Sequence, residues 1–117
     1  MHTRLAFAAA TLAATALLLP AAPAQATTYW GAIATDGSRG AMGYAWNYTS
    51  QSSARTAALN QCGRSCKVLT TFTGCGAVSH SDSANRYTGG HGATRAAAED
   101  ASRWDWDSRV VRSVCNG

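Results

Sequence analysis

The sequence predicts a small α+β domain that consists of two similar β-β-α-β units and is stapled by disulfides. Three observations lead to this prediction. Short runs of β-branched and aromatic residues alternate with two alanine-rich stretches of helical spacing. The pattern Gly31–Ala34 returns as Gly76–Ser79, 45 positions later, a separation that fits one supersecondary unit. All four cysteines lie between Cys62 and Cys115.

The first unit begins with two predicted strands. Tyr29–Ala34 is a short β-branched and aromatic run, and the turn-forming cluster Asp36–Gly40 ends it. In Met42–Tyr48 every second residue is large, so four bulky side chains share one face of a strand. We expect five aromatic side chains to fill the core: Tyr44, Trp46, Tyr48, Phe72 and Trp104.

A helix and a third strand complete this unit. The cluster Ser50–Ser53 offers side chains for an N-cap, alanines then recur at helical spacing, and Gly63 ends the predicted helix. Lys67–Phe72 follows as a strand rich in β-branched residues.

The second unit repeats this order, starting at Gly76–Ser79. Its next strand, Arg86–Gly92, has lost most of the aromatic alternation, and its glycines indicate a bulge or a close backbone approach. Thr94 is placed to cap a second helix, whose expected core face ends with Trp104. Arg109–Cys115 is the closing strand.

Residues 1–26 have the order of a secretory signal peptide. Arg4 gives a positive start, an apolar run extends to Leu19, and Ala24-Gln25-Ala26 fits a cleavage site for signal peptidase. We therefore expect a mature chain of residues 27–117 that forms one secreted, extracellular domain with no membrane span.

In an oxidising compartment, an even set of four cysteines predicts two disulfides, although four cysteines allow three pairings. The spacing of Cys62 and Cys66 fits a local bridge across a tight turn, which leaves Cys75 with Cys115. The second bridge would close a loop of about 40 residues, worth roughly 4 kcal/mol. If each of its cysteines follows the last strand of one unit, this bridge ties the two units together.

Charge and motifs argue against several function classes. Without Arg4, nine basic residues face six acidic ones, and the arginines are scattered, so we expect no nucleic-acid partner. The C-x3-C spacing does not fit paired zinc knuckles, and the chain has no nucleophile elbow or phosphate-binding loop. We assign no metal, no cofactor and no catalytic residue.

The best candidate for a chemical site is the set His80, Asp82 and His91. If the second hairpin turns near Asn85 and Arg86, the two imidazoles face each other across the strands, with Asp82 on the same face. Two histidines and a carboxylate suit metal binding or acid-base chemistry. The alternative interpretation, which we favour, is a pair of ordinary exposed histidines near a hairpin.

Aromatic residues are the candidates for a binding surface. In Trp104–Asp107, tryptophans alternate with carboxylates, a combination that suits sugar binding if Trp106 is exposed; in the alternative, Trp106 packs below the last strand. The loop Asp82–Arg86 is the candidate for a protruding inhibitory loop. The residues that we name as candidate binding residues are Trp106, Tyr29, His80 and His91.

Taken together, several segments resemble the bacterial domain of unknown function 4189 (DUF4189). They are Tyr29–Ala34, Gly43–Tyr48, the alanine-rich helix that ends in Cys62-Gly63, Cys66–Val68, Gly74–Ala77 and Gly92–Ala96. The resemblance covers essentially all of residues 27–117. It implies a small exported α+β domain with disulfides, found as a stand-alone secreted protein and proposed as an effector on host cells in some pathogens. It brings no catalytic residues. Members often have a further cysteine where this chain reads Trp104-Asp105-Trp106.

We therefore expect a secreted, monomeric, non-catalytic interaction or effector module. Its expected partner is an unidentified extracellular or envelope macromolecule. The alternatives are a small metal-dependent or hydrolytic enzyme that uses His80, Asp82 and His91, and an inhibitor of an extracellular enzyme.

Overall fold

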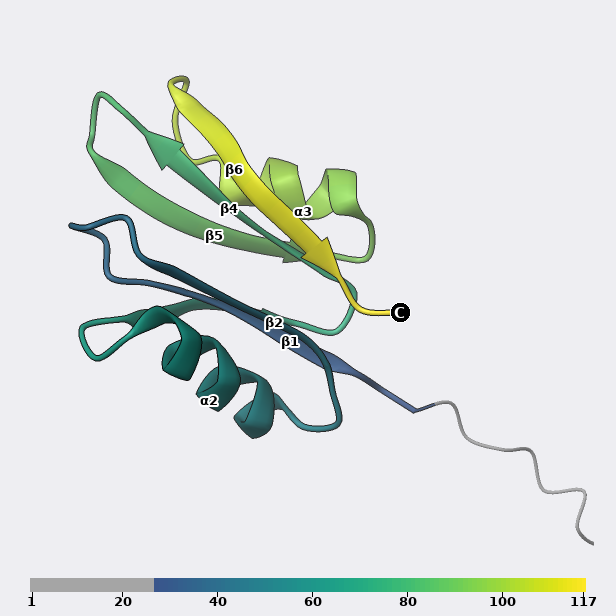
Figure 1. The fold of residues 1–117 in the computed structure, drawn as a ribbon. Helices are drawn as coiled ribbons and strands as arrows, with labels where there is room; N and C mark the ends of the chain where they lie inside the picture. Colours follow the sequence, from purple (N-terminus) through teal and green to yellow (C-terminus); the bar gives the residue numbers. More distant parts are fainter. Residues whose placement is uncertain (1–26) are drawn as a thin grey trace, which may run out of the picture.

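The structure, a computed structural model, describes residues 27–117. The signal peptide predicted for residues 1–26 lies outside this part of the chain. Within it, no helix has the length and apolar character needed to cross a membrane. The elements are β1 (Trp30–Thr35), β2 (Met42–Tyr48), α2 (Gln51–Cys62), β3 (Lys67–Phe72), β4 (Cys75–Ser81), β5 (Arg86–Gly92), α3 (Arg95–Ser102) and β6 (Ser108–Cys115) (Figure 1).

The six strands form two antiparallel sheets of the same topology, with strand orders β2-β1-β3 and β5-β4-β6. In each unit the first strand is central, the second pairs with it as a hairpin, and the helix leads to the third strand on the other side. The register repeats as well. Thr35 pairs with Met42, and the residues 45 positions later, His80 and Tyr87, pair with each other. The predicted α+β fold of two β-β-α-β units is confirmed.

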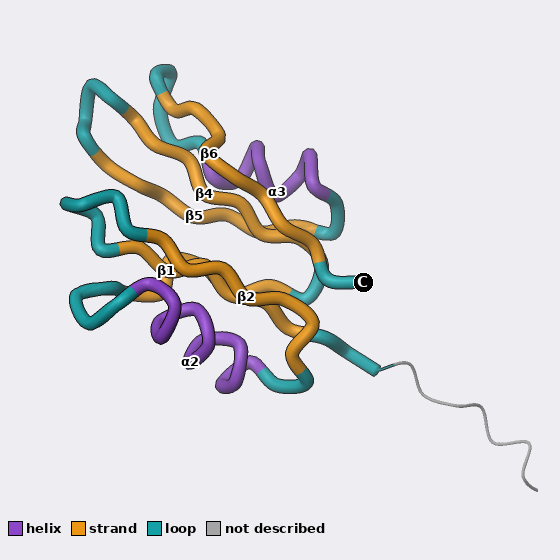
Figure 2. Tube along the Cα trace, viewed as in Figure 1, coloured by secondary structure: helices purple, strands orange, loops and turns teal. Residues whose placement is uncertain are grey.

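The two sheets pack face to face, and one helix covers the outer side of each (Figure 2). The side chains between the sheets form the central cluster, which contains Ile33, Phe72, Val78 and Val114. Helix α2 packs on a patch of alanines of the first sheet, and Ala98 of α3 packs on Cys75 and Ala77 of the second. The order of layers is therefore α2, first sheet, second sheet, α3.

Small residues let each helix lie directly on its sheet. A Cβ added at Gly43 would lie 1.9 Å from the carbonyl oxygen of Ala58, and one at Gly90 would lie 2.3 Å from the backbone nitrogen of Ser102. Gly90 thus provides the close backbone approach that the glycines of its strand predicted.

Both helices begin at predicted capping residues. The Ser50 hydroxyl accepts a hydrogen bond from the Ser53 N–H, and the Thr94 hydroxyl accepts one from the Ala97 N–H, each at 3.1 Å. These bonds satisfy backbone donors that have no partner inside the first turn of a helix.

The prediction of an aromatic core is wrong for three of its five side chains. Phe72 is buried and Tyr44 is half-buried, but Trp46, Tyr48 and Trp104 are 42%, 39% and 49% exposed. Trp104 lies beyond the last helical residue, Ser102, so it does not belong to the core face of α3. On β2 the alternation breaks at Asn47, whose φ is +64°, where the pairing with β1 also changes register.

The two disulfides join Cys62 to Cys66 and Cys75 to Cys115. Cys75 is the first residue of β4 and pairs directly with Cys115 on β6, so this bridge lies within the second unit. The prediction that it ties the two units together is therefore wrong. Only Thr73 and Gly74 separate β3 from β4, and for this reason Cys75 already belongs to the second unit.

The side chain of Asn116, and not the Cys75–Cys115 disulfide, connects the second unit to the first. Its side-chain amide donates to the carbonyl oxygens of Tyr29, Phe72 and Thr73, at 3.0–3.3 Å, and its side-chain oxygen accepts the N–H of Asn47 at 2.7 Å. The residue after β6 thereby binds the backbone of the first sheet and of the link between the units.

The ring of Phe72 lies between two equivalent glycines of the repeat. A Cβ at Gly31 would lie 2.3 Å from Phe72 Cε2, and one at Gly76 would lie 2.2 Å from Phe72 Cδ1. Both glycines are on central strands, one in each sheet. The separation of the sheets at this point is set by a single aromatic ring.

We predict that Gly76→Ala lowers the free energy of unfolding by about 1–3 kcal/mol, because the new methyl group and the Phe72 ring compete for the same space. Chemical denaturation measures this loss. Adding Phe72→Leu to Gly76→Ala should cost less than the two single losses together, since the shorter side chain leaves room. Strictly additive losses would show that Phe72 is not the neighbour that excludes the methyl group.

Candidate binding site at the hairpin end

Four connections lie at one end of the two sheets, which we call the hairpin end. They are the β1–β2 loop (residues 36–41), the α2–β3 loop (residues 63–66), the β4–β5 turn (residues 82–85) and the α3–β6 loop (residues 103–107). The candidate binding residues divide between the two ends. His80 and Trp106 lie at the hairpin end, whereas Tyr29 precedes β1 and His91 is near the last residue of β5, both at the opposite end. The structure therefore does not bring the four together.

The predicted register of the second hairpin is wrong. His80 pairs with Tyr87, and His91 pairs with Gly76. The turn occupies residues 82–85 and is closed by a hydrogen bond from the Asn85 N–H to the Asp82 carbonyl at 3.3 Å. Asn85 has a φ of +49°, which lets the chain reverse direction before residue 86.

The observed register separates the two histidines by four residues along the sheet, about 13 Å at the usual rise of a strand. Among residues 27–117, no three His, Cys, Asp or Glu side chains are placed to hold a metal ion. The set His80, Asp82 and His91 is not assembled, and the enzyme alternative loses the geometry on which it depended.

His80 instead holds the β4–β5 turn. Its Nδ1 lies 3.0 Å from Asp82 Oδ1, the other carboxylate oxygen accepts a hydrogen bond from Arg109 at 2.8 Å, and the imidazole packs on the Tyr87 ring with centroids 4.4 Å apart. The neighbouring serines point to the opposite face, where Ser79 bonds Ser102 and Ser81 bonds Asp105. No serine of this segment bonds His80, as the alternation of strand side chains requires.

Asp105 anchors the α3–β6 loop to this turn. Its carboxylate accepts hydrogen bonds from the hydroxyls of Ser81 and Ser108, each at 2.7 Å, and from the N–H of Asp107 at 3.1 Å. The hydrogen bond from Ser81, and the weaker effects of Ser108 and Asp107, lower the pKa of Asp105 from its ordinary value. Asp107 in turn accepts the N–H of Ser83 at 2.7 Å, so the loop and the turn are bonded at two points.

This anchored loop carries the most exposed tryptophan of the described chain. Trp106 is 88% exposed, so it does not pack below the last strand. Trp104 is half-exposed, and the guanidinium of Arg86 lies over its ring at 4.9 Å from the centroid. One ring of this loop, Trp104, therefore stacks with a cation of β5, and the other, Trp106, is open to solvent.

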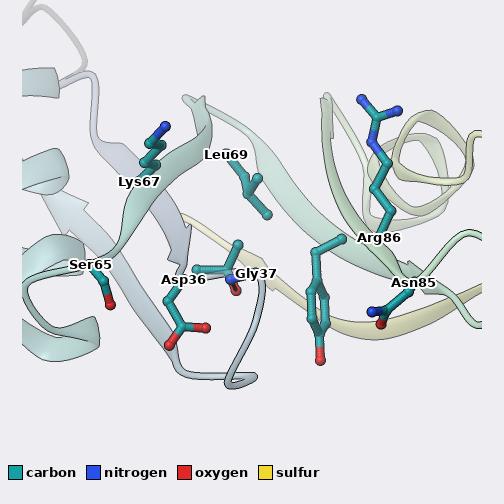
Figure 3. A pocket seen from close by; sticks show the side chains of 9 residues that line it. Asp36, Gly37, Ser65, Lys67, Leu69, Asn85 and Arg86 are labelled. Atoms are coloured by element: carbon teal, nitrogen blue, oxygen red, sulfur yellow. Dashed lines mark hydrogen bonds between the residues drawn. The ribbon is translucent and has the colours of Figure 1, made fainter.

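A cleft of about 300 Å³ lies next to this loop, between the two units (Figure 3). The residues that line it are Thr35, Asp36, Gly37, Ser65, Lys67, Leu69, Asn85, Arg86 and Tyr87. They come from the β1–β2 hairpin, the segment that enters β3, and the β4–β5 hairpin. No motif along the chain joins these segments, and sequence reasoning accordingly missed the cleft.

Charged groups occupy opposite sides of the cleft. In Figure 3 the side chains of Lys67 and Arg86 point the same way, on either side of Leu69, and the carboxylate of Asp36 points the other way. Asp36 Oδ1 accepts the backbone N–H groups of Arg39 and Ala41, at 2.9 and 3.3 Å, so it holds its own loop. Within residues 27–117, neither Lys67 nor Arg86 has a carboxylate at ion-pair distance.

We predict that Asp105→Asn removes part of the acid sensitivity of folding. Because the pKa of Asp105 is lower in the folded protein, its carboxylate stabilises the fold above the ordinary pKa, and that contribution is lost as pH falls through the lowered value. Thermal unfolding between about pH 7 and about pH 2 should show a flatter acid limb for the variant. Asp100→Asn, at an exposed helical carboxylate, is the matched control, and equal flattening in both variants would contradict the prediction.

Comparisons with known proteins extend these observations. A family model described as a domain of unknown function (DUF4189) matches residues 30–115. Protein Rv1269c of Mycobacterium tuberculosis is 50% identical over 76 residues, which are 64% of this chain and 59% of that protein. Uncharacterized protein Rv1813c of the same organism is 44% identical over 91 residues, 75% of this chain and 61% of that protein. The chain therefore spans less than two thirds of the length of these relatives.

A solved structure has the same fold. The NMR structure of Rv1813c from Mycobacterium tuberculosis matches with a TM-score of 0.67 and 40% sequence identity, and the match covers 81% of each chain. At this identity and coverage, the two-unit arrangement described above is shared by both proteins.

Proposed function

The chain belongs to the family of the domain of unknown function DUF4189, and from this premise we propose that it is a secreted interaction or effector module that acts by surface contact outside the cytoplasm. The target that we propose is an extracellular or envelope macromolecule. The single observation that carries the contact part of this proposal is the exposure of Trp106 on an anchored loop.

The pattern of residues 1–26 supports export, since a positive start, an apolar run and an A-x-A site occur in the order that signal peptidase requires. The two disulfides are compatible with an oxidising destination. They also suit a thin domain, because a chain of this size buries too little surface to be very stable without covalent staples.

The environment of Trp106 supports surface contact. Tryptophan is over-represented among the residues that dominate binding energy, and its large ring loses little conformational entropy when it is fixed. Hydrogen bonds of Asp105 and Asp107 already hold the loop, so docking would cost little additional ordering. A tryptophan that served only the fold would gain more by packing against it.

The inhibitor alternative stays a prediction, with Asp82–Arg86, which contains the turn at residues 82–85, as its candidate loop. A non-catalytic role and a monomeric state also stay proposals.

We predict that the exported product begins at Thr27 and that Ala26→Leu blocks its formation, because the position before the cleavage site accepts only small side chains. The mass of the protein recovered from culture medium measures this. Ala21→Leu, outside the A-x-A site, should leave the product unchanged. Retention of the wild-type chain in the cytoplasm would overturn the proposal of secretion.

We predict that Trp106→Ala weakens capture of the partner from envelope and culture-medium fractions at least about tenfold, as expected for a central aromatic anchor. The matched control is Trp46→Ala. This tryptophan is also exposed, but it lies toward the end of β2 that is remote from the hairpin end. Thermal unfolding of both variants checks that the fold persists. Equal capture by wild type and Trp106→Ala, or equal losses in both variants, would contradict a Trp106 surface.

A further inference from the structure

Folding gathers at the hairpin end basic side chains that are scattered along the sequence. Arg39 lies in the β1–β2 loop, Arg64 lies in the α2–β3 loop, and Lys67 follows that loop at the start of β3. Arg86 begins β5 directly after the β4–β5 turn. All four side chains are exposed, and among residues 27–117 none has a carboxylate at ion-pair distance. Three of the four connections thus bring an unneutralised cation to this end.

The carboxylates of the same end are bound to protein groups. Asp36 accepts the backbone N–H groups of its own loop, and Asp82 pairs with Arg109. Asp105 accepts two serine hydroxyls, and Asp107 accepts a backbone N–H of the β4–β5 turn. Each of these carboxylates already has donors within the protein, whereas the four cations have no ion-pair partner among residues 27–117. The cations therefore remain to attract an external anionic surface.

The fourth connection, the α3–β6 loop, adds exposed aromatic surface. Trp106 is 88% exposed and Trp104 is 49% exposed. The guanidinium of Arg86 lies 4.9 Å from the centroid of the Trp104 ring. Tryptophan is enriched at the boundary between lipid and water, because its ring is apolar and its N–H still pairs with a polar group. An arginine beside such a ring keeps its charge at the level of lipid headgroups.

The four connections form a broad end and not a single groove. In Figure 1 their tips follow one another along one side of the molecule, from the α3–β6 loop beside the second sheet to the α2–β3 loop beside the first. The cations are therefore spread over both units. A small ligand would need cations that converge on it, whereas a lipid surface presents anionic groups over its whole area. Cations on separate loops can each meet one of those groups.

We propose that the hairpin end binds the surface of an anionic lipid bilayer, with the Trp106 ring at the depth of the headgroups and the four cations beside the lipid phosphates. A basic residue close to an anionic membrane contributes about fivefold to affinity, so no single cation of this end would hold the protein there. Several cations and an aromatic anchor together give reversible attachment to the surface. The inference rests on the proposed function, because it names the chemistry of the surface that Trp106 meets.

The exposed tryptophan favours a bilayer over a soluble polyanion. An acidic peptide or polysaccharide would use the cations but would leave the apolar ring of Trp106 in water. A nucleic-acid strand stacks its bases on aromatic rings, but it also follows a continuous basic groove, and the cations here lie on separate loops of two units. A bilayer has both the anionic headgroups and the apolar interior that this end matches.

Co-sedimentation with vesicles measures this binding in the full-length mature protein with both disulfides formed. We expect binding to vesicles of equimolar phosphatidylcholine and phosphatidylglycerol, and at least about tenfold weaker binding to phosphatidylcholine alone, because only the first vesicles carry net negative charge. Tryptophan emission should shift to shorter wavelength with the anionic vesicles. Trp106→Ala should lose most of this shift, whereas Trp46→Ala, on the part of β2 remote from the hairpin end, should keep it.

Two double variants with the same change in net charge test the cations. Arg39→Gln with Arg64→Gln removes two cations of the hairpin end and should weaken binding to the anionic vesicles about twentyfold, the product of two contributions of about fivefold. Arg55→Gln with Arg112→Gln is the matched control, and its loss should be at most about threefold because screening limits the reach of distant charges. Arg55 lies in the first half of α2 and Arg112 in the middle of β6, both away from the hairpin end. Thermal unfolding checks that both double variants keep the fold.

Soluble probes separate this partner from the others. Polyglutamate and a single-stranded oligonucleotide should bind more weakly than the anionic vesicles. Tighter binding of either, equal binding to both kinds of vesicle, or equal losses in the two double variants would each overturn the proposal.

The proposed function has a separate readout, the capture of a partner from envelope and culture-medium fractions. If capture depends on Trp106 but the wild type does not bind anionic vesicles, this inference fails and the Trp106 surface stands. If the wild type neither binds vesicles nor shows capture that depends on Trp106, both fail.

Discussion

The arrangement of this domain depends on one contact, the ring of Phe72 between the glycines at 31 and 76. Any side chain at either glycine would occupy the space of the ring, so the two sheets lie as close as an aromatic ring allows. The duplication supplied a glycine to both central strands but a large side chain to only one closing strand, because the counterpart of Phe72 is Val114. One large and one small residue together fill a centre that two phenylalanines would overfill.

Small side chains also determine how closely the two helices pack on the outer faces of the sheets. Alanine and glycine on the covered faces let each helix lie directly on its sheet, and little space remains there for bulky side chains. Large aromatics are consequently found between the sheets, at strand ends and in loops. Covalent and polar staples support this thin core, the Cys75–Cys115 bridge within the second unit and the Asn116 side chain between the units.

The two units differ most where they meet solvent at the hairpin end. In the second unit, His80, Asp82 and Arg109 form a closed set of polar contacts that fixes the turn. In the first unit the residue at the position of Asp82 is Gly37, and among residues 27–117 no carboxylate lies at ion-pair distance from Lys67.

The sequence by itself determined the elements, their order, the capping residues and the duplication, because strand alternation, helical spacing and capping chemistry are local along the chain. Only the tertiary structure decided which side chains share a site. The register of the second hairpin depended on where a four-residue turn closed, and it separated His80 from His91. Trp46 is exposed because a bulge breaks the alternation of β2, and Trp104 is exposed because α3 ends before it. The cleft with Lys67 and Arg86 depended on how one unit packs on the other. Such long-range placement has no signature in local spacing, since the residues that meet there belong to separate segments of the chain.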